Sequence, residues 1–488
     1  MLHHIHFGGI ITIIIVAAYI LSIFFGLLII SQNRTPAKTL AYLILFFSLP
    51  VIGILIYYIF GENYRKKKLY KKKYLSDRKS FDRYSAYLIR LSEEIIKDHV
   101  DQLRGSEQIA RMMLNDSRLP ISINNNVELL INGEEKFAKL FEELEKAEHH
   151  IHLEYYIMEQ GHITLRLKDI LIRKAKQGVA VRMMYDDFGT SIKYKHLRDL
   201  KKAGVQAMPF YKIIFPIASS RHNYRDHRKV VIIDGKRGFT GGINMSDRYS
   251  NEFIAKNKMY WRDTHLFIEG DAIKPLQYLF FLNWNFCSKE ELPVTHDYFP
   301  DHTVKSNQLV QISYSGPDSD RASIMMSYFA AITKAKHYIY ISTPYFIPNE
   351  SLLTALQTAA LGKVDVRLLV PGVSDSTFVN AAAHSYYEDL LEAGVKIYLY
   401  QKGFMHAKTM VSDNCLSMVG SANMDIRSFD LNFELNAVVY DRKIHDGLKA
   451  VFMRDLQDSV EITLEEWSKR NRLKKLGEST ARIFSSIM

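Results

Sequence analysis

The sequence predicts an α/β protein in which two similar domains follow a hairpin of two membrane-spanning helices. Three observations on the 488-residue chain lead to this prediction: a polar motif occurs twice with the same spacing, buried strands alternate with helical stretches around both copies, and the chain begins with two long apolar segments. We expect the hairpin in residues 1–62, a basic linker in 63–115, the first domain in 116–300 and the second in 301–488.

The two N-terminal segments, residues 8–30 and 40–60, are each long enough to cross a bilayer at about 1.5 Å of rise per residue. Only Pro50 and Gly53 interrupt the second segment. A cleaved signal peptide is the alternative for the first segment, but this segment lacks a basic start and a small-residue cleavage site. A short polar loop joins the two segments, so we predict a membrane hairpin and a location in the cell membrane.

A run of basic residues, Arg65-Lys-Lys-Lys-Leu-Tyr-Lys-Lys-Lys, follows the second segment. By the positive-inside rule this end of the hairpin is cytoplasmic, since the loop between the segments carries only Arg34 and Lys38. We therefore expect both domains in the cytoplasm. The basic run also attracts anionic head groups, and the net charge of +11 suits an anionic partner, which is either a lipid surface or nucleic acid.

The two domains repeat each other along the chain. Ala147-Glu-His-His-Ile-His-Leu is similar to Ala335-Lys-His-Tyr-Ile-Tyr-Ile, and Leu200-Lys-Lys-Ala-Gly-Val is similar to Leu390-Leu-Glu-Ala-Gly-Val. Both pairs have the pattern of a helix end followed by a buried strand. Two similar halves can pair about a pseudo-twofold axis, which would bring both motifs to one seam and form a single site.

The motif itself reads His-x-Lys-x4-Asp-x6-Gly-[Gly/Ser]-x-Asn in both copies. Residues two apart on a strand point to the same face, so the histidine and the lysine project together. The aspartate lies at a hairpin turn, where its position favours a structural role. A neutral imidazole is a nucleophile or proton carrier, and lysine and asparagine donors suit phosphate oxygens. The motif candidates are His227, Lys229, Asp234, His406, Lys408 and Asp413 as the catalytic set, with Asn244 and Asn423 as phosphate-binding residues.

Other interpretations of the motif are weaker. A satisfied core histidine in each half is the simplest alternative, but the identical spacing of the two copies disfavours it. A zinc site is disfavoured because His-x-Lys supplies a single ligand, and we predict neither a metal nor another cofactor. Cys287 and Cys415 are far apart in the sequence and suggest no disulfide framework.

The doubled His-x-Lys-x4-Asp motif resembles the signature of the phospholipase D superfamily, and the resemblance covers nearly the whole chain. It implies two similar sandwich domains with pseudo-twofold symmetry and a metal-free reaction. In that reaction one histidine attacks phosphorus and the other protonates the leaving alcohol. It also implies an acidic partner for each histidine, for which Asp263 and Glu434 are the candidates. The second copy has Ser421 where the first has Gly242, so a supporting hydroxyl is expected from the second copy alone.

Several further segments resemble bacterial cardiolipin synthases: Pro36-Ala-Lys-Thr-Leu-Ala, Phe60-Gly-Glu-Asn-Tyr-Arg, Thr343-Pro-Tyr-Phe-Ile-Pro and Ser428-Phe-Asp-Leu-Asn-Phe-Glu. This resemblance implies that two phosphatidylglycerols yield cardiolipin and glycerol through a phosphatidyl-histidine, with anionic membrane lipids as partners. A phospholipase D and a phosphatidylserine synthase-like transferase are the rival functions. A nuclease gains nothing from two membrane spans, so we expect no nucleic acid partner. The oligomeric state stays open.

Two features outside the motif have alternative interpretations. Tyr155, Tyr345 and His384 are candidates for the lining of an acceptor pocket, although buried aromatic packing is the simpler expectation. The basic segment 467–488 is either an amphipathic helix that lies on a bilayer or a helix that packs on the second domain.

Overall fold

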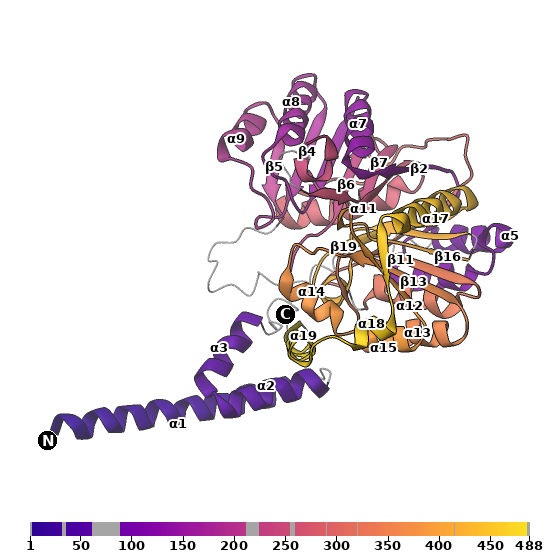
Figure 1. Cartoon of the computed structure of the whole chain (residues 1–488). Helices are drawn as coiled ribbons and strands as arrows, with labels where there is room; N and C mark the ends of the chain where they lie inside the picture. The colour runs from indigo at the N-terminus through magenta and orange to yellow at the C-terminus, as the bar shows by residue number, and fades with distance from the viewer. Residues whose placement is uncertain are drawn as a thin grey trace. The chain divides into compact units, whose positions relative to one another are not determined.

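The computed structural model describes residues 2–31, 36–60, 88–210, 224–253, 259–288, 290–319, 321–413 and 415–485 (Figure 1). The chain divides into two compact units, one with the N-terminal helices and one with both repeats. The basic run that starts at Arg65 lies outside the described residues.

The N-terminal unit contains α1 (Leu2–Ile30), α2 (Pro36–Ser48) and α3 (Pro50–Phe60). Among the described residues one helix, Thr12–Ile30, is long and apolar enough to cross a membrane, with a mean hydropathy of 3.0. It lies within the first of the two expected spans.

The second expected span, residues 40–60, does not form one helix. The chain breaks between α2 and α3 at Pro50, which lacks a backbone N–H and clashes with a preceding helical turn. The rings of Tyr42 and Tyr57 lie 5.3 Å apart, whereas a straight helix would separate them by roughly 22 Å along its axis. Gly53 permits this fold, because a Cβ there would approach the Leu45 carbonyl oxygen to 2.7 Å. The expected hairpin of two straight spans is therefore not confirmed.

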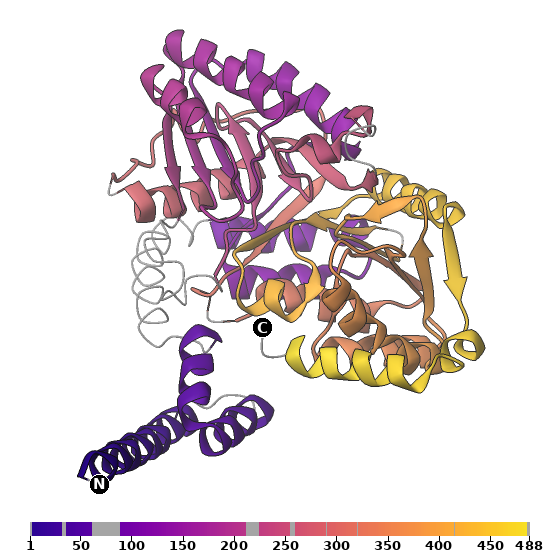
Figure 2. The same ribbon diagram turned by 60° about the vertical axis from the view of Figure 1, so that its left-hand side comes forward.

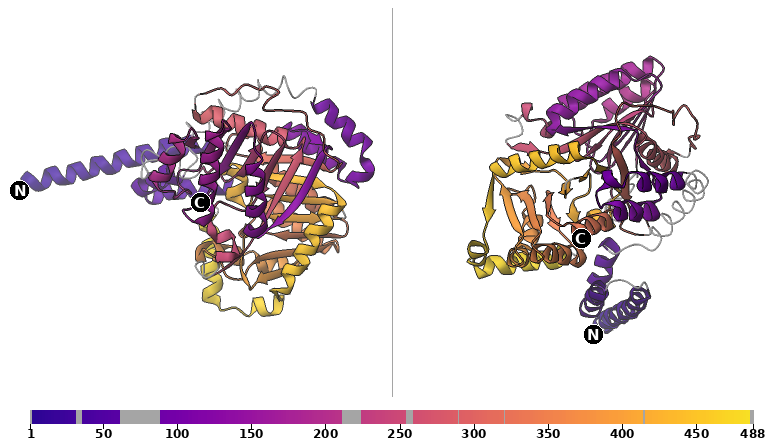
Figure 3. Two further views of the ribbon diagram at one scale, coloured as in Figure 1. Left: turned by 90° about the horizontal axis from the view of Figure 1, so that it is seen from above. Right: turned by 90° about the vertical axis from the view of Figure 1, so that its right-hand side faces the viewer.

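The first repeat is built on a seven-stranded mixed sheet with the order β2-β9-β7-β6-β3-β4-β5. Its strands are β2 (Asn125–Ile131), β3 (His150–Tyr155), β4 (Ala180–Tyr185), β5 (Gln206–Pro209), β6 (Lys229–Ile233), β7 (Arg237–Gly241) and β9 (Thr264–Gly270). Helices α7 (Asn132–Glu145), α8 (His162–Lys176) and α9 (Tyr194–Lys202) lie on one face. Helix α11 (Ile273–Ser288) lies on the other face (Figure 3). It contacts β3 through hydrogen bonds from Gln277 to His152 and from Asn283 to Glu154.

The second repeat has the same strand order within a nine-stranded sheet, β1-β10-β19-β17-β16-β11-β13-β14-β20. Its strands are β1 (Ile121–Ser122), β10 (Leu309–Ser315), β11 (Tyr338–Ser342), β13 (Asp365–Pro371), β14 (Lys396–Tyr400), β16 (Thr409–Ser412), β17 (Leu416–Gly420), β19 (Glu434–Tyr440) and β20 (Ser459–Ile462). Helices α12 (Ser323–Lys334) and α13 (Glu350–Leu361) cover one face and α17 (Arg442–Gln457) the other. The predicted α/β repeat is thus present, and Figure 2 shows the two repeats in contact along one side.

The segment expected to be a linker contributes to the core of the second repeat. Helices α5 (Val100–Leu103) and α6 (Glu107–Ser117) bury Leu103, Ile109 and Leu114 in the same hydrophobic cluster as the second sheet. Strand β1 then pairs with β10, at the edge of that sheet. The apolar residues of this segment explain its position, and the expected boundary at residue 116 falls inside α6.

Candidate functional site

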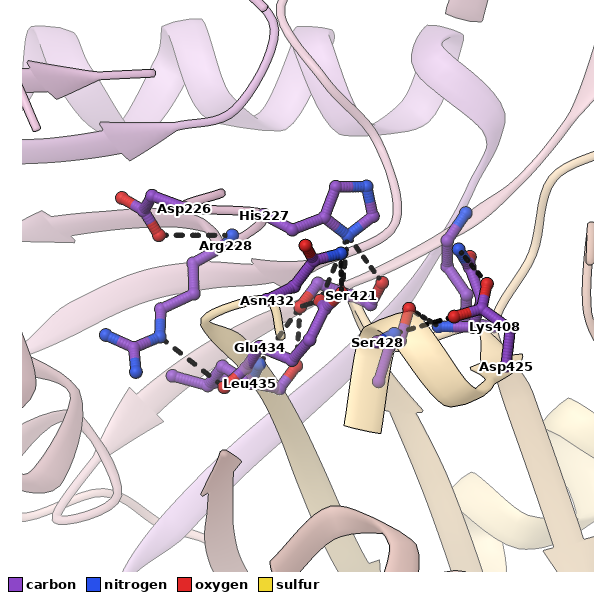
Figure 4. A network of polar contacts seen from close by, with 12 residues as sticks. Asp226, His227, Arg228, Lys408, Ser421, Asp425, Ser428, Asn432, Glu434 and Leu435 are labelled. Atoms are coloured by element: carbon purple, nitrogen blue, oxygen red, sulfur yellow. Dashed lines mark hydrogen bonds and ion pairs between the residues drawn. The ribbon is translucent and has the colours of Figure 1, made fainter. Parts of the chain in front are cut away.

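The first motif enters the site through a backbone bridge to the other repeat. His227 lies just before β6, and its N–H donates to the Phe433 carbonyl at 3.0 Å, while the Phe433 N–H donates to the Arg225 carbonyl at 2.8 Å. Because Phe433 precedes Glu434, this bridge sets the imidazole beside the Glu434 carboxylate. His227 Nδ1 is 3.0 Å from Glu434 Oε2 (Figure 4).

The second motif is held by the equivalent contacts in the opposite direction, from the first repeat to the second. Strand β15 (Gly403–Met405) pairs in parallel with β8 (Tyr260–Arg262), and the His406 N–H donates to the Arg262 carbonyl at 2.8 Å. His406 Nδ1 therefore lies 2.6 Å from Asp263 Oδ2. Each motif histidine is held by the acidic residue of the other repeat, so the two repeats form one site.

These contacts set the protonation state of both imidazoles. We assign the proton of each neutral ring to Nδ1, because the carboxylate beside it is an acceptor, and this leaves a lone pair on Nε2. Burial lowers the pKa of His227 to about 4, although the Glu434 carboxylate acts to raise it. Burial, with the nearby Lys408 ammonium, lowers the pKa of His406 to about 3. Both rings are therefore neutral near pH 7 and can act as nucleophiles.

The two motif lysines are buried beside the histidines. The ammonium of each donates to the carbonyl of its own motif histidine, at 2.6 Å for Lys408 and His406. Burial lowers the pKa of Lys229 to about 7 and that of Lys408 to about 8. The charge of Lys408 also contributes to the lowered pKa of Lys229, so cations from both repeats act on the same region.

The Gly/Ser difference between the two motifs has a steric explanation. The Ser421 hydroxyl donates to the Glu434 carboxylate and accepts from the Leu435 N–H at 3.0 Å, so it supports the partner of His227. At the matching position of the first repeat, a Cβ on Gly242 would lie 2.1 Å from Asp263 Oδ1. The glycine therefore makes room for the Asp263 carboxylate, and the supporting hydroxyl comes from the second repeat, as the sequence suggested.

The two asparagines are buried, and the Nδ2 of each makes one hydrogen bond within the protein. Asn244 Nδ2 donates to the Tyr249 hydroxyl at 2.6 Å, and its Oδ1 accepts from the Ile157 N–H. Asn423 Nδ2 donates to Asp425 Oδ2 at 3.1 Å. Among the described residues Asn423 Oδ1 is a buried atom without a partner. An amide Nδ2 carries two N–H donors, so one such bond leaves capacity for a phosphate oxygen.

The motif aspartates lie at the opposite ends of their strands from the histidines. Asp234 accepts backbone N–H bonds from Glu148, His149 and His150 at the start of β3. Asp413 does the same for Lys336, His337 and Tyr338 before β11. Asp234 follows Lys229 by the length of β6, roughly 16 Å at 3.3 Å per residue. The structure therefore gives both aspartates a role in strand alignment and does not bring them to the histidines.

Aromatic residues outside the motif, which were not identified from the sequence, pack around the two imidazoles. The Tyr156 ring lies 4.7 Å from that of His227, and the rings of Tyr249 and Trp261 each lie 5.4 Å from that of His406. The neighbouring Tyr155 points instead into the core, where its hydroxyl bonds Lys136. The alternation of side chains along a strand could have indicated Tyr156 in place of Tyr155. Strand β3 ends at Tyr155, and neighbouring residues point in opposite directions.

The other two residues considered for the acceptor pocket have different positions. The Tyr345 hydroxyl donates to Asp375 at 2.8 Å, and its ring lies 6.3 Å from Phe404, the neighbour of His406 at 5.7 Å. Tyr345 is thus at the edge of the site. His384 packs on the Trp467 ring at 5.1 Å, outside this group.

The described residues contain no group of three or more His, Cys, Asp or Glu side chains that could hold a metal ion. Among the described residues Cys287 and Cys415 form no disulfide.

Comparisons with known proteins agree with this arrangement. A family model described as "Cardiolipin synthase, PLD-like domain" matches residues 140–257 and again residues 328–456. The chain is 40% identical over 468 residues to cardiolipin synthase 2 of Bacillus anthracis, covering 95% of this chain and 89% of that protein. It is 41% identical over 473 residues to a cardiolipin synthase of Geobacillus kaustophilus, with 96% and 92% covered. The crystal structure of a phosphatidylserine synthase from Haemophilus influenzae shares the fold, with a TM-score of 0.58, 13% identity, and 78% of this chain and 97% of that chain covered.

Proposed function

Because this chain belongs to the cardiolipin synthase family of phospholipase D-like proteins, we propose that it transfers a phosphatidyl group from one phosphatidylglycerol to another. The products are cardiolipin and glycerol. Family membership identifies the chain as a phosphatidyltransferase, and one observation of the site supports the chemistry most directly. Two neutral histidines, each held through Nδ1 by the acid of the other repeat, have their Nε2 atoms beside two buried lysines, and Lys408 Nζ lies 3.1 Å from Nε2 of His406.

In the first step, Nε2 of one histidine attacks the phosphorus of the donor lipid. A P–N bond forms and the P–O bond to glycerol breaks. The other histidine enters this step as an imidazolium, since a bound phosphodiester anion raises the pKa of a base that it contacts. It gives its proton to the departing glycerol oxygen and becomes neutral.

The second step reverses the proton transfer. The neutral histidine takes the proton from a head-group hydroxyl of a second phosphatidylglycerol, and the oxygen of that hydroxyl attacks phosphorus. The P–N bond breaks, so the first histidine is released in its starting form and cardiolipin leaves. One phosphodiester replaces another, so the reaction requires no nucleotide.

The charges of the site support both steps. An ammonium has three N–H donors, so Lys229 and Lys408 can each bond a non-bridging oxygen while they keep the histidine carbonyl. These donors, with the second N–H of Asn244 and of Asn423, stabilise the charge that develops on the phosphoryl oxygens. Asp263 and Glu434 stabilise the imidazolium form of the histidine that they hold.

The acceptor lipid brings a second phosphate, and two arginines are suitable partners for it. Arg225 precedes His227, and Arg427 belongs to α16 (Ile426–Asp430) of the other repeat. Both guanidinium charges act on the Tyr156 hydroxyl, whose ring packs on His227. A guanidinium can bond phosphate with two parallel N–H groups. We therefore assign Arg225 and Arg427 to recognition of the acceptor phosphate.

The location of the protein forms part of the proposal. The apolar helix Thr12–Ile30 is consistent with membrane association. The lysine-rich run after residue 64 supports a cytoplasmic position for the catalytic unit, with the segments 8–30 and 40–60 as the membrane anchor. Such an anchor holds the site where acceptor lipid is concentrated, so a weakly bound second phosphatidylglycerol can compete with water.

Product analysis tests the proposed reaction. The purified full chain in vesicles that contain phosphatidylglycerol should release cardiolipin and glycerol in equal amounts, with little phosphatidic acid. The His227→Ala variant is the control for contaminating activity. Phosphatidic acid as the main product at all lipid densities would make the protein a phospholipase. Phosphatidylserine formation from a nucleotide-activated lipid and serine, or cleavage of DNA with phosphatidylglycerol untouched, would assign it to another branch.

A further inference from the structure

The C-terminal helix α19 (Arg472–Ser485) has large apolar side chains on its exposed side. One side packs on α14 (Thr377–His384) (Figure 1). Ala481 and Glu478 on this side are buried. The other side exposes Leu473, Leu476 and Ile483 by 77%, 64% and 63%. Separations of three and seven residues place these three side chains in one row along a helix. The segment therefore packs on the second repeat, which is one of the two alternatives from the sequence, and it also presents an apolar row outward.

The apolar surface extends from α19 to α14. A groove of about 930 Å³ runs between the two helices, and its lining includes Phe378, Leu473 and Leu476. Phe378 exposes 38% of its surface. We define Phe378, Leu473, Leu476 and Ile483 as the docking face. Large apolar side chains grouped on a surface mark a site of interaction with a membrane or another protein.

The charges around the docking face are positive on the outside. The acids of this region are paired with cations: Glu478 accepts from Arg470 at 2.5 Å, Glu388 from Lys475 at 2.9 Å, and Asp389 lies 3.5 Å from Arg482. Arg472 and Lys474, by contrast, are exposed next to the leucines. Apolar side chains flanked by exposed cations complement a bilayer with anionic head groups.

A chain of contacts connects the docking face to the candidate site. Asp375 lies just before α14, and it accepts the Tyr345 hydroxyl bond at 2.8 Å. The Tyr345 ring contacts Phe404, which in turn packs on His406 at a ring distance of 5.7 Å. Phe378 of the docking face is therefore three residues along the chain from Asp375, which contacts the edge of the site.

We propose that the docking face binds an anionic lipid bilayer and so holds the site entrance against the surface that supplies both lipids. This inference rests on the proposed function only in that the substrate comes from a bilayer. Docking by this face is separate from anchoring by the N-terminal helices. An anchor limits the distance between the site and the bilayer, whereas a docked face also fixes the orientation of the site relative to the bilayer. A second copy of this chain is the competing occupant of the face.

The kinetic test uses the full chain with Leu473→Gln and Leu476→Gln together, reconstituted in vesicles. We expect turnover of phosphatidylglycerol in the bilayer to fall at least tenfold. Turnover of a short-chain, water-soluble phosphatidylglycerol added to phosphatidylcholine vesicles should stay within twofold of the parent. Tyr194→Gln is the matched control, since Tyr194 on α9 of the first repeat is 80% exposed. An unchanged rate on bilayer lipid, or an equal loss on both substrates, overturns the proposal.

A binding measurement keeps the inference separate from the proposed function. A Leu476→Trp variant in vesicles with brominated acyl chains should lose fluorescence relative to the same protein in vesicles without bromine. A Tyr194→Trp variant should lose much less. Equal quenching of the two tryptophan variants overturns docking. If the double glutamine variant sediments as a smaller species than the parent and its bilayer turnover is unchanged, the docking face binds a second copy of the chain, and the proposal is also overturned. If the parent protein acts on neither form of phosphatidylglycerol, the proposed function fails, while the quenching result still decides the docking.

Discussion

Replacement of Glu434 by glutamine is expected to lower turnover by about 10²- to 10³-fold. The Glu434 carboxylate lies 3.0 Å from His227 Nδ1 and acts to raise the pKa of this histidine. Opposite charges about 4 Å apart, at an effective dielectric constant near 20, attract by about 4 kcal/mol, and each 1.4 kcal/mol corresponds to about tenfold in rate. A glutamine retains a hydrogen bond but no charge, which makes roughly 10³-fold the upper end of the expected loss.

The assay is cardiolipin formation in phosphatidylglycerol vesicles, with thermal unfolding as a check that the variant is folded. Asp263→Asn should give a loss of similar size, because the same contact at 2.6 Å holds His406. Glu128→Gln is a control, since that carboxylate lies on β2 with a side chain that is 49% exposed. A folded Glu434→Gln variant that keeps more than a tenth of the parental rate would refute the role given to the cross-repeat carboxylates.

Four further outcomes are expected. His227→Ala and His406→Ala should each reduce turnover by several orders of magnitude and the double variant by little more, because the residues act as a unit; additive losses in steady-state rates would argue against one shared site. The kcat/KM should fall as the pH rises through about 7 to 8, because the lowered pKa values of Lys229 and Lys408 mean that the ammonium charges are lost there, and a profile flat from pH 6 to 9 would contradict this. Asp234→Asn should destabilise the protein by about 1–3 kcal/mol in denaturant unfolding and leave the turnover of the folded fraction within a few-fold, whereas a large loss of turnover without a loss of stability would restore a catalytic role. A cysteine placed at residue 33 should react with an impermeant reagent on intact cells and one placed at residue 70 should not, and the reverse pattern would refute the proposed orientation.

The repeat and the motif residues could be predicted because they depend on spacing along the chain. A doubled pattern with the same internal distances indicates a duplicated strand pair, and two-residue spacing places a histidine and a lysine on one face. Asp263 and Glu434 could be named as partners because the resemblance to the phospholipase D superfamily implies an acid after each motif. The exchange of partners could not be predicted, because the bonds of Phe433 and Arg262 to the opposite motif join segments whose pairing no local pattern encodes.

Other differences have equally local causes. The apolar run 40–60 is long enough for a membrane-spanning helix. Its length and composition do not reveal that the chain folds back on itself at Pro50 and Gly53. The basic run that starts at Arg65 predicts a linker in residues 63–115. Its few apolar residues, such as Leu103 and Leu114, are spaced to bury one helical face, and that face completes the core of a repeat far along the chain.

The exchange of acidic partners between the repeats has a consequence for how the protein is made. Residues 1–300 contain His227 but not the carboxylate that holds it, which arrives only with Glu434. A ribosome-bound or truncated first half therefore lacks both Glu434 and the second histidine, His406, so its site is incomplete. Because the partners are exchanged between the repeats, the complete site forms only when synthesis is nearly finished. A mutation in one repeat also affects the other, since the loss of one acid removes the partner of the other repeat's histidine.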